Sequence, residues 1–317
     1  MTLLLQGAGV QTIAGGSSVA LLLDLEADTG VTTDDTPFSG TGMITQSGTT
    51  VTGIGTLFGP EVVIGDRITA SGIDGLVQSI PQNTSLTLNT SASVAIGVSF
   101  TISPQSNTVR VSAWADQSGK GNDFQASGTV RPFFQIVDGA PAVSFDSFND
   151  YMESGNFADN LSEFTIIGVT ARTVDGMGGN DYQFIGKIDN YLSGQGWSAI
   201  NADNLIIQED GGSVYMQWGI VGGLPGYSEK FILSVVKASN SQVRIFKNGV
   251  DLTVLQYDFG PVGTFTNNLN VRIGSMSDGQ GSIGDRVRAI RIYDIALPDA
   301  ARASIEMELA ARYGITL

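Results

Sequence analysis

The chain has 317 residues, enough for one large β domain or two unequal ones at about 150 residues per domain. It contains no Cys and no His, which excludes disulfides, thiolate metal sites, cysteine nucleophiles and Ser–His catalytic pairs. The 31 acidic and 16 basic residues give a net charge of −15, which opposes binding to a phosphate backbone. Only 15% of residues are charged and 41 are Gly, a composition that predicts a β protein with small polar residues on its strands and turns.

Residues 1–19 are expected to form an N-terminal arm. The apolar triplet Leu3–Leu5 follows no basic segment, and no apolar stretch approaches 18 residues, so we expect neither a secretory signal nor membrane insertion. Such an arm is either mobile or ordered against a partner, and we favour docking of residues 1–18 on a partner surface; the competing account is that the arm pairs with the chain's own sheet as an edge strand.

Residues 36–103 have a distinct composition and are predicted to form a small inserted β domain. They are rich in Thr, Ser, Gly and Val, carry few charges, and contain about five strand-length segments bounded by Gly, Pro or Asn. The pairs Thr36-Pro37 and Ser103-Pro104 flank the segment, and X-Pro pairs favour an extended entry and exit. We therefore predict a β-barrel or sandwich that folds autonomously.

From Thr108 to Asp294, strand candidates recur about every ten residues without intervening helices, a pattern typical of a β sandwich. The alternating segment that ends at Asn248-Gly249 predicts a tight hairpin turn. One helix is predicted, from Asp299 to a C-terminal Gly314, with the apolar stripe Ala301, Ile305 and Leu309. We expect this helix to cap one edge of the sandwich.

A series of motifs carries a family resemblance. In order they are ALLLD (20–24), VSAWADQSGKGNDF (111–124), RPFF (131–134), GAPAVSFDSFNDYME (139–153), VRIFKNG (243–249), LNVRIGS (269–275) and a last helix ending RYG. The series resembles the concanavalin A-like (laminin-G-like) jelly-roll domains of bacterial surface and bacteriophage virion proteins. The resemblance implies an all-β jelly-roll sandwich built from residues 20–35 and 104–317.

The segment 36–103 shows a second, looser resemblance. VTGIGTLFGPEVVIGDRI is similar to small β domains of phage tail and decoration proteins. Both resemblances point to a phage particle.

The strand and turn around Trp114 are expected to fix a loop. Alternation places Ser112, Trp114 and Asp116 on one face, and Gly119 and Gly121 supply positive φ in the turn that follows. A loop-fixing set without a ligand is favoured over a binding site. The signature residues are Trp114, Asp116, Gly119, Gly121, Asn122, Phe145 and Asp146.

Catalysis is not expected, because His and Cys are absent and no carboxylate pair stands in strand register. A glycan-binding groove is the main functional alternative, since aromatic and amide side chains gather in the central third of the sequence. The candidate residues are Trp197, Trp218, Tyr182, Tyr191, Tyr215, Tyr227 and Asn180. Core packing of the same rings is favoured over a binding groove.

A Ca²⁺ site is a further alternative suggested by the family resemblance, because laminin-G-like domains often hold one Ca²⁺ ion. Calcium takes six to eight oxygen ligands, and the acidic residues offer them. The candidate ligands are Asp175, Asp181 and Asp189, with Asp278 and Asp285 as additional acids.

These observations favour a non-catalytic structural protein of a bacteriophage virion, placed on the head or the tail, over a carbohydrate-binding adhesin. The expected partners are other virion proteins, further copies of the same chain, and host-surface glycans if the jelly roll binds sugar. Nucleic acid is not expected to bind.

Overall fold

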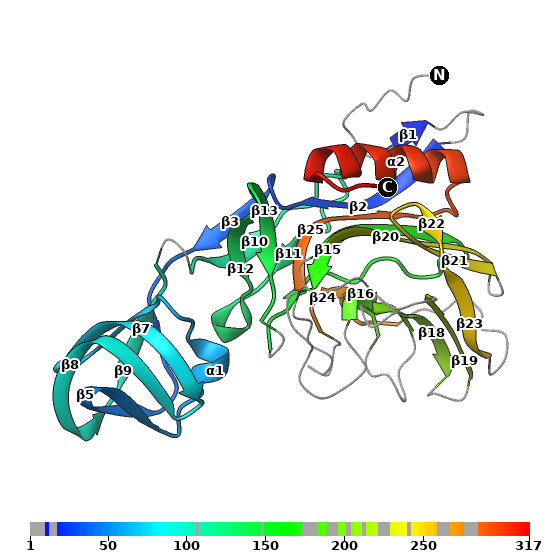
Figure 1. Cartoon of the computed structure of the whole chain (residues 1–317). Helices are drawn as coiled ribbons and strands as arrows, with labels where there is room; N and C mark the ends of the chain where they lie inside the picture. The colour runs from blue at the N-terminus through cyan, green and yellow to red at the C-terminus, as the bar shows by residue number, and fades with distance from the viewer. Residues whose placement is uncertain are drawn as a thin grey trace.

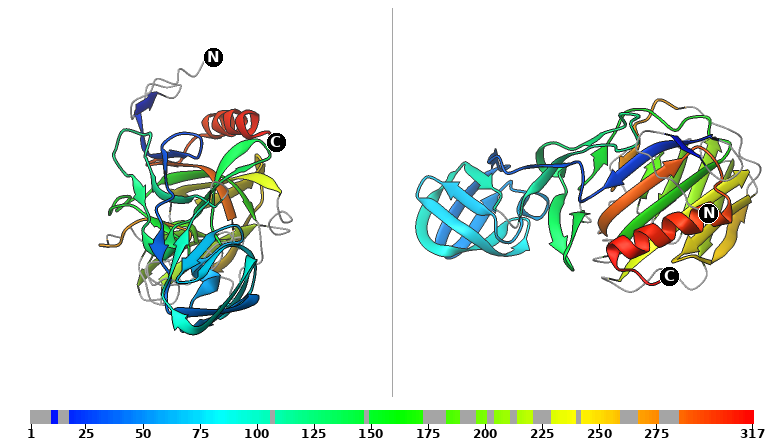
Figure 2. Two further views of the ribbon diagram at one scale, coloured as in Figure 1. Left: turned by 90° about the vertical axis from the view of Figure 1, so that its left-hand side faces the viewer. Right: turned by 90° about the horizontal axis from the view of Figure 1, so that it is seen from above.

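The computed structural model describes residues 10–12, 18–105, 108–146, 149–172, 183–188, 196–200, 204–210, 214–220, 229–239, 242–258, 267–275 and 285–317. For residues 10–12, 18–19, 129, 183, 200, 204–210, 214–220, 254–258 and 285 it describes the backbone alone. The chain folds into a jelly-roll sandwich with a C-terminal helix and a smaller β domain that projects from one end of the sandwich (Figures 1 and 2). The all-β fold class predicted from the sequence is confirmed.

The first sheet of the sandwich, here the helix-side sheet, is built around β25 (Asp285–Tyr293). One edge of β25 pairs with β15 (Phe164–Arg172) along its whole length. The other edge pairs with β2 (Ser18–Glu26) and, further along, with β13 (Ala140–Ser144). Beyond β15 the sheet continues through β20 (Lys230–Ser239), β21 (Gln242–Lys247) and β22 (Val250–Asp251).

The second sheet, here the pocket-side sheet, consists of short antiparallel strands. Their order is β11 (Phe124–Gln125), β14 (Met152–Glu153), β24 (Arg272–Ile273), β16 (Gln183–Lys187), β17 (Gly196–Ile200), β18 (Asn204–Asp210), β19 (Val214–Ile220) and β23 (Thr253–Asp258). The two sheets are connected at one end through β10 (Arg110–Trp114), which pairs with β11, β3 (Val31–Asp34) and β12 (Phe133–Val137). Strand β12 in turn pairs with β13 of the helix-side sheet.

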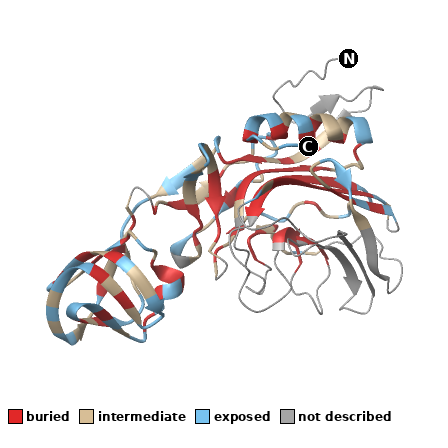
Figure 3. Ribbon diagram, in the orientation of Figure 1, coloured by how far each residue is buried: buried red, intermediate tan, exposed pale blue. Residues whose placement is uncertain are grey.

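The main core lies between the two sheets (Figure 3). Large rings from both sheets fill it, among them Trp114, Phe124, Phe145, Phe164 and Trp197. Each ring contributes apolar surface on the order of 150–250 Å², so these residues dominate the hydrophobic stabilisation of the sandwich.

Helix α2 (Asp299–Tyr313) begins and ends close to the predicted residues. Gly314 has φ 63°, and its N–H donates to the carbonyl of Ala310. The sequence suggested that this helix caps an edge of the sandwich, and that expectation is wrong. The helix lies over the outer face of the helix-side sheet, because Ile167, Val169 and Ile232 point outward there and pack against Ile305 and Leu309 (Figures 1 and 3).

The projecting domain is a six-stranded sheet curled around its own core. Its strands run in the order β4 (Phe38–Ser39), β9 (Phe100–Ser103), β6 (Arg67–Ala70), β7 (Ile73–Gln82), β8 (Ser85–Val98) and β5 (Met43–Ile54). A short helix, α1 (Phe58–Glu61), was not predicted. The core includes Phe58, Phe100, Ile68 and Val77. Among the described residues, no strand of this domain pairs with a strand of the sandwich.

Part of the N-terminal arm pairs with the sandwich, as the competing edge-strand interpretation has it and not as the favoured docking interpretation does. Strand β1 (Val10–Thr12) pairs antiparallel with β2, with Val10 opposite Ala20. The pairing of β2 with β25 starts only at Leu21. The first three residues of β2, 18–20, are the ones that pair with β1. The triplet Leu3–Leu5 lies outside the described residues.

In the described part of the chain, none of the helices has the length and apolar character needed to cross a membrane.

Candidate functional site

The signature loop after β10 is held by Asp116. One carboxylate oxygen accepts the backbone N–H groups of Asp24 (3.0 Å) and Ser118 (2.9 Å), and the other accepts the Ser118 hydroxyl (2.7 Å) and the Asn122 N–H (3.1 Å). The Asn122 amide donates to the carbonyl of Leu22 at 2.8 Å. These bonds tie the loop to β2, and they are the bonds expected of a loop-fixing set.

Trp114 is fully buried, and its indole N–H donates to the carbonyl of Glu26 at 3.1 Å. The expectation that Ser112 shares its face is wrong. The pairing of β10 with β3 shifts between Val111 and Ala113, so Val111 and Trp114 both face the core while Ser112 is only partly buried. A β-bulge of this kind breaks the two-residue period on which the prediction relied.

Phe145 and Asp146 directly follow β13, near the junction with the projecting domain. Phe145 is in the core, and Asp146 accepts the backbone N–H groups of Asn149 (3.3 Å) and Asp150 (3.4 Å). Asp150 is fully buried, and this burial, reinforced by the nearby charge of Asp146, raises its pKa well above the ordinary value. These residues form a turn that brings two acids close to Arg110.

Arg110 connects the two domains. Its guanidinium donates to the carbonyls of Glu61 (2.9 Å) and Arg131 (3.2 Å), lies 4.0 Å from the Asp66 carboxylate, and stacks on the Phe133 ring with 3.9 Å to the centroid. Glu61 and Asp66 come from the projecting domain, so the contact is a buried polar junction.

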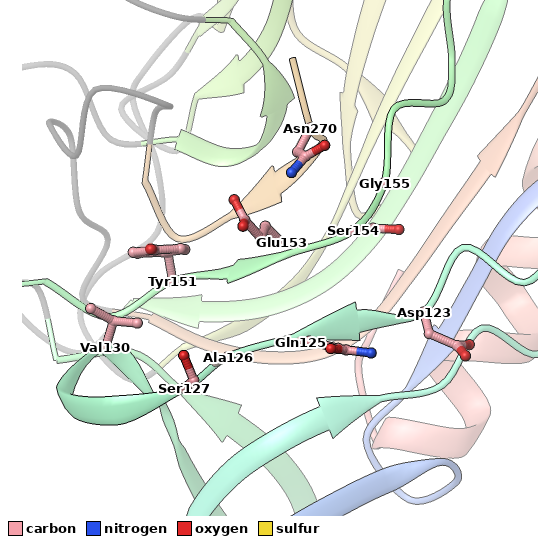
Figure 4. Close-up of a pocket in the computed structure, with 10 residues that line it drawn as sticks. All are labelled: Asp123, Gln125, Ala126, Ser127, Val130, Tyr151, Glu153, Ser154, Gly155 and Asn270. Carbon is pink, nitrogen blue, oxygen red and sulfur yellow. The ribbon is translucent and has the colours of Figure 1, made fainter. Parts of the chain in front are cut away.

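A cavity of about 400 Å³ opens on the pocket-side sheet, at its β11–β14–β24 end (Figure 4). Strand alternation creates it: Phe124, Met152 and Ile273 point into the core, so their neighbours Gln125, Glu153 and Arg272 point outward. The register sets Gln125 opposite Glu153, and Glu153 opposite Arg272, in one row across three strands. The cavity is lined by Asp123, Gln125, Ala126, Ser127, Val130, Tyr151, Glu153, Ser154, Gly155 and Asn270.

Arg272 orders two of the lining residues. Its Nε donates to Glu153 Oε2 at 3.0 Å, and its guanidinium lies over the Tyr151 ring at 4.2 Å from the centroid. The Arg272 side chain is only 15% exposed, whereas that of Glu153 is 37% exposed. The carboxylate of Glu153 is therefore held in place by Arg272 yet keeps solvent access.

Asp123 connects the cavity to the signature loop. Its carboxylate accepts the backbone N–H of Asp116 at 2.8 Å, and the adjacent Phe124 pairs with Trp114 across β10 and β11. The loop-fixing residues thus position one wall of the cavity, although they do not line it themselves.

The lining chemistry is polar and planar. Two carboxylates and two amides offer paired donors and acceptors, and Tyr151 adds an aromatic ring. The backbone of Tyr151 is held by its N–H, which donates to the carbonyl of Val130 at 3.0 Å. Such a set suits a neutral ligand rich in hydroxyl groups, since each planar group can bond two neighbouring hydroxyls.

None of the glycan-site residues predicted from the sequence is among the described residues that line this cavity. Trp197 is wrong as a sugar platform: it is 1% exposed and packs against Phe164 with ring centroids 5.8 Å apart. Alternation on β17 turns it toward the core. Trp218 and Tyr215 lie on β19, where only the backbone is described, and Tyr182, Tyr191, Tyr227 and Asn180 lie outside the described residues.

Sequence reasoning missed the residues that line the cavity. Their signal was present in the motifs, because each outward residue stands next to a large apolar one: Phe124-Gln125, Met152-Glu153 and Arg272-Ile273. The sequence could not predict that β11, β14 and β24, which are far apart along the chain, lie side by side.

The described residues contain no group of three acidic side chains arranged to hold a metal ion. The predicted Ca²⁺ ligands Asp175, Asp181 and Asp189, and also Asp278, lie outside those residues, and Asp285 is described only as backbone.

No protein-family model and no curated protein sequence matches the chain. Solved structures that are similar in part include the receptor-binding domain of botulinum neurotoxin type G, with 13% identity and a TM-score of 0.42 over 64% of this chain and 52% of that one. The binding domain of Paraclostridial mosquitocidal protein 1 gives 16% and 0.42 over 64% and 50%, and Trypanosoma rangeli sialidase gives 11% and 0.39 over 62% and 30%. The chain spans about half or less of the length of these proteins, and likeness at this level carries no argument about function.

Proposed function

We propose that this chain is a non-catalytic accessory protein of a bacteriophage particle whose jelly roll binds a carbohydrate in the cavity beside Tyr151. The observation that carries the binding role is the row of Gln125 and Glu153 across neighbouring strands, with Tyr151 and Asn270 around the same cavity. The role on a phage particle rests on the ordered series of sequence motifs.

A sugar is the ligand class that fits the lining best. A nucleic acid would bring phosphates toward Asp123 and Glu153 in a chain of net charge −15. A large apolar ligand would leave the carboxylates and amides of the wall without partners, which costs about 1–3 kcal/mol per buried group. A saccharide satisfies these groups through its hydroxyls and can place a C–H face on Tyr151.

The non-catalytic part of the proposal rests on the constraint around Glu153. Glycoside hydrolysis needs one carboxyl that donates a proton and a second that attacks or activates water. Glu153 is engaged by Arg272 and Asp123 by the backbone of Asp116, so both carboxylates have structural partners.

A glycan array followed by calorimetry on the soluble protein tests the binding role. Gln125→Ala should weaken binding of the best glycan about tenfold, the effect of one lost hydrogen-bonding side chain. Gln242→Ala is the matched control, since Gln242 is also an exposed strand residue but lies on β21 of the other sheet. Equal affinities of the two variants, or no glycan bound, would refute the sugar site.

Two further measurements test the remaining parts. Product analysis after incubation with the bound glycan should show no cleavage, and turnover that Glu153→Gln removes would overturn the non-catalytic assignment. Mass spectrometry of purified particles from the host strain should detect the chain in fixed proportion to a major capsid or tail protein. Its absence from particles would overturn the virion role.

A further inference from the structure

The projecting domain carries almost no charge. Residues 36–103 contain four charged side chains, Glu61, Asp66, Arg67 and Asp74. Glu61 and Asp66 are buried at the junction, and Arg67 forms a two-bond ion pair with Asp74 at 2.7 and 2.6 Å. Removing these four from the chain totals leaves 28 acidic and 15 basic residues elsewhere, a net charge of −13.

The same domain exposes an apolar cluster, here the Met43 patch, formed by Met43 (49% exposed), Ile54 (59%) and Ile96 (81%). Met43 and Ile54 meet at Gly97, where an added Cβ would lie 3.3 Å from Met43 Cβ and 3.5 Å from Ile54 Cδ1. Ile96 is adjacent to Gly97, in a stretch where the β5–β8 register shifts between Ile44 and Gln46.

The shift explains why Ile96 is exposed. Ile44 pairs with Val98 and Gln46 with Val94, so β8 spends two more residues than β5 between these pairs. Val94 and Val98 pack on the domain core, while Ile96 is displaced outward. An isoleucine that is 81% exposed buries little apolar surface, so Ile96 contributes little to the folding stability of this domain.

We propose that the Met43 patch is the contact through which copies of this chain associate with one another. Identical copies carry identical charge, so bodies of net charge −13 repel wherever the sandwiches approach. The neutral domain offers a surface free of that repulsion, and it projects from the end of the sandwich, so two copies can meet there with the sandwiches apart (Figures 1 and 2).

The patch serves as the anchor of a larger contact. A stable interface buries about 800 Å² on each partner, more than three side chains supply. Exposed small polar residues on β5, among them Ser47, Thr49 and Thr50, extend the uncharged surface beyond the patch. Apolar anchors surrounded by small polar residues are the usual anatomy of such contacts.

Sedimentation velocity over a concentration series tests the proposal. The wild-type protein should associate reversibly, and association should strengthen as salt is raised, because screening weakens the repulsion between sandwiches. Ile96→Asp should lower the association constant about tenfold or more. Ile136→Asp is the matched control, since Ile136 is 62% exposed on β12 of the sandwich and the variant adds the same charge.

Each outcome bears on the proposal. A wild-type protein that stays monomeric at its solubility limit refutes it, as do equal losses for Ile96→Asp and Ile136→Asp, or association that salt weakens. Ile96→Thr, which adds no charge, should give an intermediate loss. Unchanged thermal unfolding of all three variants shows that the losses do not arise from misfolding.

Discussion

The two domains of this chain handle charge in opposite ways. The sandwich buries ions in clusters: Arg291, 5% exposed, contacts Asp24 (3.2 Å), Glu26 (2.6 Å) and Glu308 (2.9 Å), which joins β2, β25 and α2. The projecting domain has an apolar core, an uncharged surface and one exposed ion pair. Both domains therefore depend mainly on apolar burial, and the sandwich alone adds a buried ion cluster in which the loss of one partner leaves the others uncompensated.

The difference explains where the domains meet. Arg110 of the sandwich contacts the buried Asp66 carboxylate and the Glu61 carbonyl of the projecting domain. The buried charges of the projecting domain therefore lie at the junction. We infer that the projecting domain folds around its own core and uses its buried acids to dock. Changes in one core should then leave the other core intact, whereas changes at the junction should affect both.

The largest effect is expected from Trp114→Ala. The change empties a fully buried site and removes the indole bond to Glu26, at a cost of about 4 kcal/mol. Calorimetry should show the sandwich transition lowered and the other transition nearly unmoved. Phe100→Ala, which removes a ring packed on Phe58 at 5.8 Å in the projecting domain, should do the reverse. Equal shifts of both transitions in either variant would show that the domains unfold as one unit.

A somewhat smaller effect is expected from Arg110→Met at the junction. The variant keeps an apolar stem beside Phe133 but leaves Asp66 and Asp150 buried without their cation, a loss of about 3 kcal/mol. Limited proteolysis should then cut between the domains faster than in the wild type. The double variant Arg110→Met/Asp150→Asn should recover part of the loss, because it removes one of the uncompensated acids. No difference between the single and double variants would contradict this account of the junction.

The sequence predicted the elements of both domains better than their arrangement. The hairpin at Asn248-Gly249 is confirmed, with φ of 47° and 80°, because the residues of a tight turn determine its geometry locally. Helix α2 is confirmed for the same reason, since its stripe and its terminal Gly lie within one segment. The position of α2 was not predictable, because it depends on which face of a distant sheet is left apolar.

The candidate site shows the same division. The loop around Asp116 followed from local turn chemistry, whereas the cavity depends on β11, β14 and β24 lying side by side. Trp197 was a candidate both for the core and for a sugar platform, because aromatic residues suit both, and it is buried in the core. Composition cannot separate these two roles, and only strand register decides which face a ring occupies.

The pH dependence of stability separates the two domains further. Burial raises the pKa of Asp150 and of Asp66 in the folded protein above the unfolded value of 3.8. The folded state therefore binds more protons, and this contribution is present below pH 3.8 and is lost as pH rises through the folded pKa values. We expect the junction to gain stability as pH falls from 7 toward 4. Asp150→Asn should flatten this slope in thermal unfolding, while Phe100→Ala should leave it unchanged. A slope that Asp150→Asn does not alter would contradict the buried-acid explanation.

The smallest effect is expected from a matched pair of glycine substitutions. Gly314 at the end of α2 and Gly48 in β5 both have φ 63°, and an added Cβ meets nothing within 4 Å at Gly48 and only Lys230 Nζ, at 3.9 Å, at Gly314. Alanine at either position thus introduces the same left-handed backbone strain, about 1 kcal/mol, with no steric clash. Because the strain is equal, any difference between Gly314→Ala and Gly48→Ala reports on the domain that contains the residue. Gly314→Ala should lower only the sandwich transition, since α2 packs on the helix-side sheet, and Gly48→Ala should lower only the transition of the projecting domain. If Gly48→Ala also lowered the sandwich transition, the projecting domain would have to contribute to sandwich stability through the Arg110 junction, and its autonomy would be refuted.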